Sequence, residues 1–196
     1  MSPWEALEDR VPLFVMQVLL GGGNSFSAGG PGKGMYSRLY QQVLRHRDVE
    51  AAEAYIEPSG LFGISGACTP TYVPSLLQHM AKQMLILYLQ PVPEEELSRA
   101  RNMLKCNILT YLESPHMVFQ DIGQQLLTDG VYVTPEEICA RIDAVTPEDI
   151  QRVVAMALDQ NPSLACIGED IRGVPSHEVI CGWFRQYLQK GHDRQP

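Results

Sequence analysis

Residues 21–34 constrain this 196-residue chain more than any other segment, because seven of its sixteen glycines fall there, in GGGNSFSAGGPGKG. Glycine loses more conformational freedom on folding than any other residue, and it is favoured where φ is positive or where backbones approach closely. The segment separates an apolar run, 11–20, from a stretch with helical period, 35–46. It therefore predicts a long surface loop between two helices, the kind of segment that often carries function.

The first function to consider for such a loop is phosphate binding, and the spacing excludes it. The P-loop pattern needs a glycine at position 27 and a hydroxyl residue at position 34, where the chain has Ser27 and Gly34. The dinucleotide pattern G-x-G-x-x-G fails at Phe26 for the first glycines and at Ser37 for the last. This loop is not a nucleotide site.

Residues 19–40, LLGGGNSFSAGGPGKGMYSRLY, resemble the glycine-rich loop of the α subunits of mitochondrial processing peptidases. These subunits are non-catalytic members of the pitrilysin-type metallopeptidase superfamily, in which the tail Ser-Arg-Leu-Tyr is common. Three further motifs fit the α subunits in order and spacing, so that the resemblance covers most of 9–170: YLES at 111–114, FQDIGQQ at 119–125 and VTPEDI at 145–150.

The resemblance implies the C-terminal half of an α subunit, which recognises presequence peptides for a β subunit that carries the zinc ion. It implies no catalytic residue and no cofactor in this chain, and a place in the mitochondrial matrix or on the matrix side of the inner membrane. The loop would contact or gate the substrate: Phe26 is its one large apolar side chain, and its small polar residues can bond a peptide backbone. The implied substrate-binding residues are Gly21, Gly22, Gly23, Asn24, Ser25, Phe26, Ser27, Gly29, Gly30, Gly32, Lys33 and Gly34.

The residues themselves offer little catalytic chemistry. None of the five histidines forms H-x-x-E-H or H-E-x-x-H, the helix-borne zinc pairs of metallopeptidases. His177, Glu178 and Cys181 form a conceivable ligand set, but a solvated histidine at a helix N-terminus is the favoured interpretation. No G-x-S-x-G motif supports a serine hydrolase. We expect no catalysis by this chain alone.

The net charge of −8 argues against nucleic acid as a partner. An acidic surface suits an Arg-rich presequence, although most acidic proteins use their charge for solubility. The glutamate run 94–96 is accordingly interpreted as a solvated helix start, with presequence contact as the minority alternative. No run approaches the roughly 18 apolar residues of a membrane span, and the acidic first ten residues are unlike a transit peptide.

The five cysteines are odd in number and form no C-x-x-C pair, so that disulfide and zinc-ribbon frameworks lack support. We expect reduced, mostly buried thiols, which is typical of a reducing compartment.

Periodicity and turn signals predict the elements. Pro12 is best tolerated in a first turn, which places the start of the first helix near 9–11. A final helix starts at Ser176, with Val179, Trp183 and Leu188 facing inward. The other predicted helices are 35–46, 71–89, 94–113, 114–127 and two that start at Thr134 and Thr146; the predicted strands are 49–57, 61–68 and a short buried one at 162–168.

Paired strands followed by consecutive helices predict an α+β fold, an antiparallel sheet with helices packed on one face. We expect one domain, 1–190, and a disordered tail, 191–196. The family resemblance also implies a strand upstream of the first helix, for which the eight residues before Asp9 leave no room. We therefore expect a split α subunit, in which a separate chain supplies the N-terminal half and completes the sheet, since an open apolar edge is an aggregation hazard.

Two alternatives remain open. In some lineages these subunits are also core proteins of respiratory complex III, so the chain could be a structural subunit with little or no processing role. It could also be a metallopeptidase half that supplies transition-state contacts to zinc held elsewhere, with Arg38 and Tyr40 as the residues to suspect.

Overall fold

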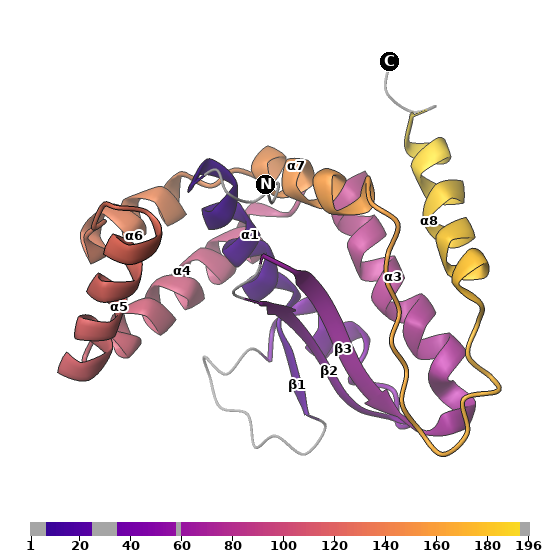
Figure 1. Cartoon of the computed structure of the whole chain (residues 1–196). Coiled ribbons are helices and arrows are strands. Elements are labelled where there is room, and N and C mark those ends of the chain that lie inside the picture. The colour runs from indigo at the N-terminus through magenta and orange to yellow at the C-terminus, as the bar shows by residue number, and fades with distance from the viewer. Residues whose placement is uncertain (1–6, 25–34, 58–59, 193–196) are drawn as a thin grey trace.

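The computed structural model describes residues 7–24, 35–57 and 60–192, which form a small sheet and a surrounding set of helices (Figure 1). In chain order the elements are α1 (Leu7–Leu20), β1 (Gly22–Asn24), α2 (Arg38–Gln42), β2 (Val49–Ile56), β3 (Phe62–Cys68), the 3-10 helix η1 (Pro70–Tyr72), α3 (Val73–Leu89), α4 (Glu94–Tyr111), α5 (Pro115–Thr128), α6 (Pro135–Ala144), α7 (Pro147–Leu158) and α8 (His177–His192). None of the helices in the described ranges is long and apolar enough to cross a membrane.

The sheet is antiparallel and ordered β1-β2-β3, so that β3 is one of its edges. Two backbone hydrogen bonds show which residues of β2 face each neighbouring strand. The amide of Ala54 donates to the Gly21 carbonyl on the β1 side, and the amide of Glu57 donates to the Leu61 carbonyl on the β3 side. Ile64 stands opposite Ala54. Because backbone groups alternate along an antiparallel ladder, the amide and carbonyl of Ile64 point away from β2, toward the open edge.

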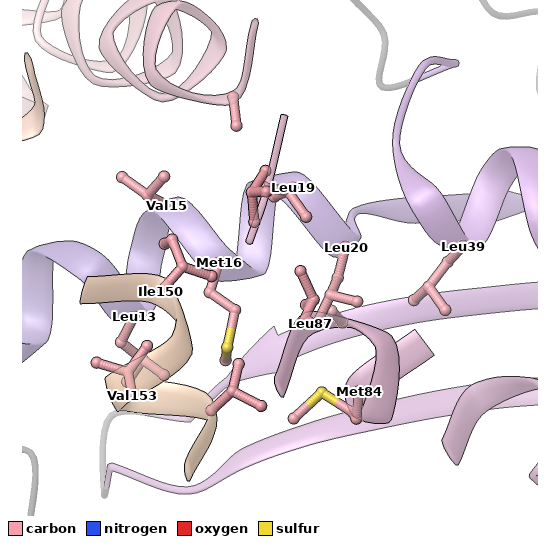
Figure 2. Close-up of a cluster of buried hydrophobic side chains, with 14 of the residues drawn as sticks. Leu13, Val15, Met16, Leu19, Leu20, Leu39, Met84, Leu87, Ile150 and Val153 are labelled. Atoms are coloured by element: carbon pink, nitrogen blue, oxygen red, sulfur yellow. The ribbon is translucent and has the colours of Figure 1, made fainter. Parts of the chain in front are cut away.

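The core lies between the sheet and the helices, and α1 runs through its centre. Leu13 of α1 is 2% exposed, and Met16 and Leu20 are fully buried. In Figure 2 Leu13 and Met16 lie beside Val153 and Ile150 of α7, while Leu20 lies near α3. Each such side chain contributes roughly 1.5–3 kcal/mol of hydrophobic stabilisation. The predicted α+β class, with helices packed against one antiparallel sheet, is confirmed.

Most predicted elements are present within a residue or two, and the helix starts are the most accurate. The Thr134 hydroxyl accepts a bond from the Glu137 amide, and Thr146 forms a full capping box with Asp149. Pro135 and Pro147 occupy the first helical position of α6 and α7. These signals are local, because the cap, the proline and the acid lie within four residues of one another.

Two helices differ from the prediction at their ends. Helix α1 begins at Leu7, which makes Pro12 its sixth residue, outside the first turn. Only the bond from residue 12 to the carbonyl of residue 8 is lost there, and burial of the following residues compensates for it. The predicted helix 35–46 is reduced to the five residues of α2, because the chain turns after Val43 to enter β2.

The predicted strand 162–168 is wrong. These residues belong to no strand, and those from Ser163 onward are exposed. The apolar run Leu164 to Ile167 has the composition of a buried strand, but a strand requires a neighbour that accepts its hydrogen bonds. Within the described ranges, the sheet ends at β3.

Helix α8 starts at His177, one residue after the predicted start, but its inward face differs. Val179 is 47% exposed, whereas Ile180 and Cys181 are buried. The helix reaches His192, and the predicted tail residues 193–196 lie outside the described residues, as does the side chain of Leu188.

The cysteines are all free thiols, but the expectation that they are mostly buried is wrong. Only Cys181 is buried; Cys68 and Cys139 are half-buried, and Cys106 and Cys166 are exposed. Cys106 lies in α4, and Cys166 lies in the segment that forms no strand.

Candidate functional site: the base of the glycine-rich loop

Four of the predicted substrate-binding residues are described by the structure: Gly21, Gly22, Gly23 and Asn24. They lie between the end of α1 and the end of β1, where the chain leaves the core. The others lie outside the described residues: Ser25, Phe26, Ser27, Gly29, Gly30, Gly32, Lys33 and Gly34. The described residues therefore form the base of the loop, where the chain leaves α1 and returns to α2.

The chain enters the loop through Gly21 and Gly22, whose backbone angles favour glycine. Gly21 has φ of 53° and Gly22 has φ of 126°, values that L side chains rarely adopt. A Cβ atom on Gly22 would lie 1.9 Å from the carbonyl oxygen of Ala52 in β2. A Cβ atom on Gly21 would lie 2.4 Å from the Cβ of Ser37. Both positions require glycine because the chain passes against backbone on one side and against Ser37 on the other.

Ser37 joins the returning side to the departing side. Its side chain is buried, 7% exposed, and its Oγ accepts a hydrogen bond of 3.1 Å from the Gly22 amide. The Gly21 amide donates to the Gln17 carbonyl at 2.7 Å, and the Gly21 carbonyl accepts from Ala54 at 2.9 Å. The two ends of the loop are thus held together and fixed to α1 and β2.

Arg38 fixes the returning side to α4. Its Nε and Nη2 donate to the two carboxylate oxygens of Glu96 at 2.7 and 2.9 Å, a bidentate pair. The side chains of Arg38 and Glu96 are only 12% and 20% exposed. A charge-assisted bidentate pair in a partly buried place is stronger and more specific than an exposed one. Arg38 is therefore engaged as a structural clamp, which disfavours the alternative that it supplies transition-state contacts.

The glutamate run 94–96 is less solvated than the sequence suggests. Each carboxylate pairs with an arginine: Glu94 with Arg101, Glu95 with Arg99 and Glu96 with Arg38. Glu94 and Glu95 remain 68% and 84% exposed, as expected for a helix start, while Glu96 is part of the clamp.

A cavity of about 370 Å³ opens beside this base, between α1 and α4. Tyr36 forms one side, and the Arg99 guanidinium lies 5.7 Å from the centre of its ring. The lining surface is mainly apolar, with polar and charged residues of α4 and Ser37 of the base among its members: Val18, Leu19, Tyr36, Ser37, Glu96, Arg99, Ala100, Asn102, Met103, Cys106 and Asn107. Sequence patterns missed this cavity because its walls come from three segments that only the fold brings together.

His177 lies at the first residue of α8 and is exposed, as predicted. Its Nε2 lies 2.8 Å from the Pro162 carbonyl and 3.4 Å from the sulfur of Cys181, so that the ring joins α8 to the segment after α7. Glu178 is exposed. Across the described ranges, no group of three or more histidine, cysteine or acidic side chains could hold a metal ion.

A second cluster of titratable groups lies between α2 and α3. The rings of His46 and His79 are stacked with centroids 4.3 Å apart, and the Tyr72 hydroxyl lies 3.1 Å from Nε2 of His79. Burial lowers the pKa of His79, and His46, Lys82 and Arg45 lower it further. His46 and His79 are 33 positions apart, and no spacing rule could have paired them.

Three relatives named mitochondrial-processing peptidase subunit alpha illustrate the similarity. The Rattus norvegicus protein is 38% identical over 177 residues, which is 88% of this chain and 33% of that protein. The Solanum tuberosum protein is 37% identical over 187 residues, 93% of this chain and 37% of that protein. The Neurospora crassa protein is 42% identical over 154 residues, 74% of this chain and 27% of that protein.

Two solved structures share the fold. A conserved protein from Enterococcus faecalis V583 matches with a TM-score of 0.64 and 21% identity over 75% of this chain and 32% of its own. A chain of complex III2 from Candida albicans, determined with Inz-5 bound, matches with a TM-score of 0.65 and 21% identity over 77% of this chain and 37% of its own.

The chain spans about a third of the length of the curated relatives it matches. A family model described as the peptidase M16 inactive domain matches residues 1–104, more than half of the chain. The helix α1, the sheet, the loop base and the clamp between α2 and α4 all lie within that match. The chain belongs to the peptidase M16 family, through its inactive domain.

Proposed function

We propose that this chain is a non-catalytic, presequence-recognising portion of a mitochondrial processing peptidase α subunit. Its glycine-rich loop contacts or gates the substrate for a β subunit that holds the catalytic zinc. The inactive-domain match and the α-subunit relatives support this proposal. So does the sequence, which contains neither H-x-x-E-H nor H-E-x-x-H.

The observation that carries the proposal is the clamped base of the loop. Gly22 and Ser37 join its two ends, and the Arg38–Glu96 pair ties the returning end to α4. These contacts bring the residues where the chain enters and leaves the loop together, beside α1, β2 and α4. Fixed ends reduce the conformational entropy that is lost when a loop binds a peptide.

The proposal requires two partner chains. One is the β subunit with its zinc ion, and the other is a separate chain that supplies the N-terminal half of the α subunit. Recovery of such a chain together with this one, by native purification and mass spectrometry, tests the second requirement. The mitochondrial names of the relatives support a place in the matrix or on the matrix side of the inner membrane.

The test is removal of the loop with its base left intact. Residues 25–32 are deleted, while Gly21 to Asn24 and Ser37 stay, and the assembled enzyme is purified from the organism's own cells through this chain. We expect presequence cleavage to slow by about tenfold or more, roughly 1.4 kcal/mol of transition-state stabilisation. The matched control replaces glycines 29, 30 and 32 by serine, which keeps the loop length.

The deletion should leave the free energy of unfolding and the recovered partner chains unchanged, which the same preparations measure. If the enzyme with the deletion cleaved presequences as fast as the unaltered enzyme, the proposal would be wrong. Slow cleavage in the serine control as well would assign the effect to backbone freedom rather than to loop length.

The second candidate is a structural core subunit of respiratory complex III with little or no processing role. The likeness to a chain of the Candida albicans complex, at 21% identity, supports the fold that this candidate needs. Migration of the chain with a membrane complex after mild detergent treatment, without presequence cleavage in that fraction, would favour it. Cleavage activity that follows the chain through native fractionation would favour the first candidate.

A further inference from the structure

Helix α5 turns a face without any charged residue to solvent. The helix lies at one end of the molecule, far from α3 and α8 (Figure 1). Its half-buried residues, among them Val118, Ile122 and Gln125, lie on one side. The exposed residues of the opposite side recur at intervals of three and four: His116, Phe119, Gln120, Gln124 and Leu127. The solvent side of a helix ordinarily carries charged residues, so this side has the composition of an interaction surface.

The two large apolar side chains of this face stand on either side of a gap. Phe119, Gly123 and Leu127 are spaced four apart, and residues with this spacing form one ridge along a helix. A Cβ atom on Gly123 would meet nothing within 4 Å. The ridge is therefore interrupted at Gly123, and an apolar side chain of a second polypeptide can sit there between Phe119 and Leu127.

A helix fits this face better than an extended peptide does. The backbone groups of α5 are bonded within the helix, so that the face offers side chains and few free backbone groups. A strand laid on it would leave its own amides and carbonyls unpaired over apolar side chains, whereas a helix satisfies its own. Since α5 has 14 residues, a partner helix in contact with the whole face would be about 21 Å long.

The charges around α5 are negative. Residues 106–140 contain no lysine or arginine, although the chain has 15 of these residues in all. The same segment contains five carboxylates: Glu113, Asp121, Asp129, Glu136 and Glu137. The cations that border it, Lys105 and Arg141, are each paired with a carboxylate. An acidic surface attracts a cationic partner and repels an anionic lipid surface.

We propose that the exposed face of α5 binds the apolar face of a basic amphipathic helix. One large apolar side chain of that helix sits over Gly123, between Phe119 and Leu127, and its cationic residues lie toward the surrounding carboxylates. In the assembled enzyme this helix belongs to the presequence, so the inference rests on the proposed function. It adds a contact region outside the glycine-rich loop and its base.

The first test is direct binding to the purified full chain, followed by fluorescence anisotropy. The probe is a labelled synthetic peptide as long as α5, with leucines on one side of its helix and arginines on the other. The control peptide has the same composition in scrambled order, so that its charge is kept and its apolar face is lost. We expect the scrambled peptide to bind at least about tenfold more weakly. Added salt should weaken binding of the first peptide.

Variants of the chain test the face and its charge separately. Leu127→Gln and Gly123→Leu should each weaken peptide binding by at least about tenfold, because one removes an apolar contact and the other fills the gap. Leu61→Gln is the matched control, since Leu61 is exposed outside α5, and it should change binding by less than about twofold. Glu113→Gln should weaken binding about threefold at low salt, and Glu169→Gln, an exposed acid elsewhere, should not.

A thiol placed on the face reports on the assembled enzyme. Gln120→Cys puts it on the exposed side of α5, and mass spectrometry separates its alkylation from that of the native cysteines. The arginine peptide should slow this alkylation by at least about fivefold, and the scrambled peptide should not. If the enzyme that lacks residues 25–32 cleaved presequences at the normal rate, the proposed role of the loop would fail, while binding at α5 would still be measured.

Four results would overturn the inference. Equal binding of the scrambled peptide would mean attraction by charge without a fitted face. Undiminished binding to Gly123→Leu would mean that the gap holds no side chain. Slow alkylation of Gln120→Cys before any peptide is added would assign the face to a permanent subunit contact. Self-association that Leu127→Gln abolishes, in a chain that binds no peptide, would assign it to a second copy.

Discussion

Gly22 and Gly23 share positive φ values but have different surroundings. A Cβ atom on Gly22 would lie 1.9 Å from a backbone oxygen of β2, whereas a Cβ atom on Gly23 would meet nothing within 4 Å. We expect Gly22→Ala to lower the free energy of unfolding by about 3 kcal/mol and Gly23→Ala by about 1 kcal/mol, since only the first adds a clash to backbone strain. Urea unfolding of the two variants measures the difference. Equal losses would mean that the loop base yields to the added methyl group.

His79 makes the stability of the molecule depend on pH. Its pKa is lowered in the folded state by burial and by the positive charges of its neighbours, so that the unfolded chain binds a proton more readily. The contribution of neutral His79 to stability is complete at pH values above the pKa of the unfolded chain, about 6.5. It is lost as the pH falls through the lower pKa of the folded state. We expect the urea concentration at the unfolding midpoint to decrease as the pH is lowered from about 7 to about 5. The variant His79→Gln should show a smaller decrease over the same range.

The control for this experiment is His116→Gln, since His116 is exposed on α5. That variant should keep the slope of the unaltered chain. A steep pH dependence that survives in His79→Gln would assign the proton uptake to other groups.

Between elements, the Arg38–Glu96 pair links α2 to α4, whereas the Glu95–Arg99 pair lies within α4. The first pair is 12% and 20% exposed, and the second is 47% and 84% exposed. We expect Glu96→Gln to lower the free energy of unfolding by about 1–2 kcal/mol, since it leaves a partly buried guanidinium without its charge partner. Glu95→Gln should change it by less than about 0.5 kcal/mol, and thermal unfolding of both variants compares them.

If Glu96→Gln proved as mild as Glu95→Gln, the contact between α2 and α4 would not be what fixes the returning end of the loop. A loss of cleavage activity in Glu96→Gln with stability unchanged would instead place Glu96 in contact with the substrate.

The sequence predicted some elements correctly and others not, depending on whether the contacts that form them are local. The starts of α6 and α7 were predictable because Thr134 and Thr146 bond to residues three positions on. The absence of a strand at 162–168 could not be predicted. The segment has the composition of a strand, but a strand also needs a neighbouring strand to pair with, and composition does not show whether one is present. The cavity beside the loop base and the stack of His46 on His79 likewise depend on contacts between distant segments.

At the scale of the whole molecule, α5 carries apolar residues that nothing in the described chain covers. None of its residues is buried; Phe119 is 77% exposed and Leu127 is 88% exposed. Exposed large apolar side chains gathered on one element are unusual for an isolated soluble protein and typical of an interaction surface. The exposed apolar residues of α5 therefore form a candidate interaction surface.

The isolated chain should therefore be folded but prone to association through α5. We expect the double variant Phe119→Asp and Leu127→Asp to keep the free energy of unfolding within about 0.5 kcal/mol, because neither side chain loses burial. It should bind less of a hydrophobic dye and form fewer aggregates in sedimentation. Leu97→Ala is the contrasting control, since Leu97 in α4 is fully buried and its truncation should lower stability by about 2–5 kcal/mol. A loss of 2 kcal/mol or more in the double variant would mean that α5 packs against the rest of the chain, and its apolar residues would then be core.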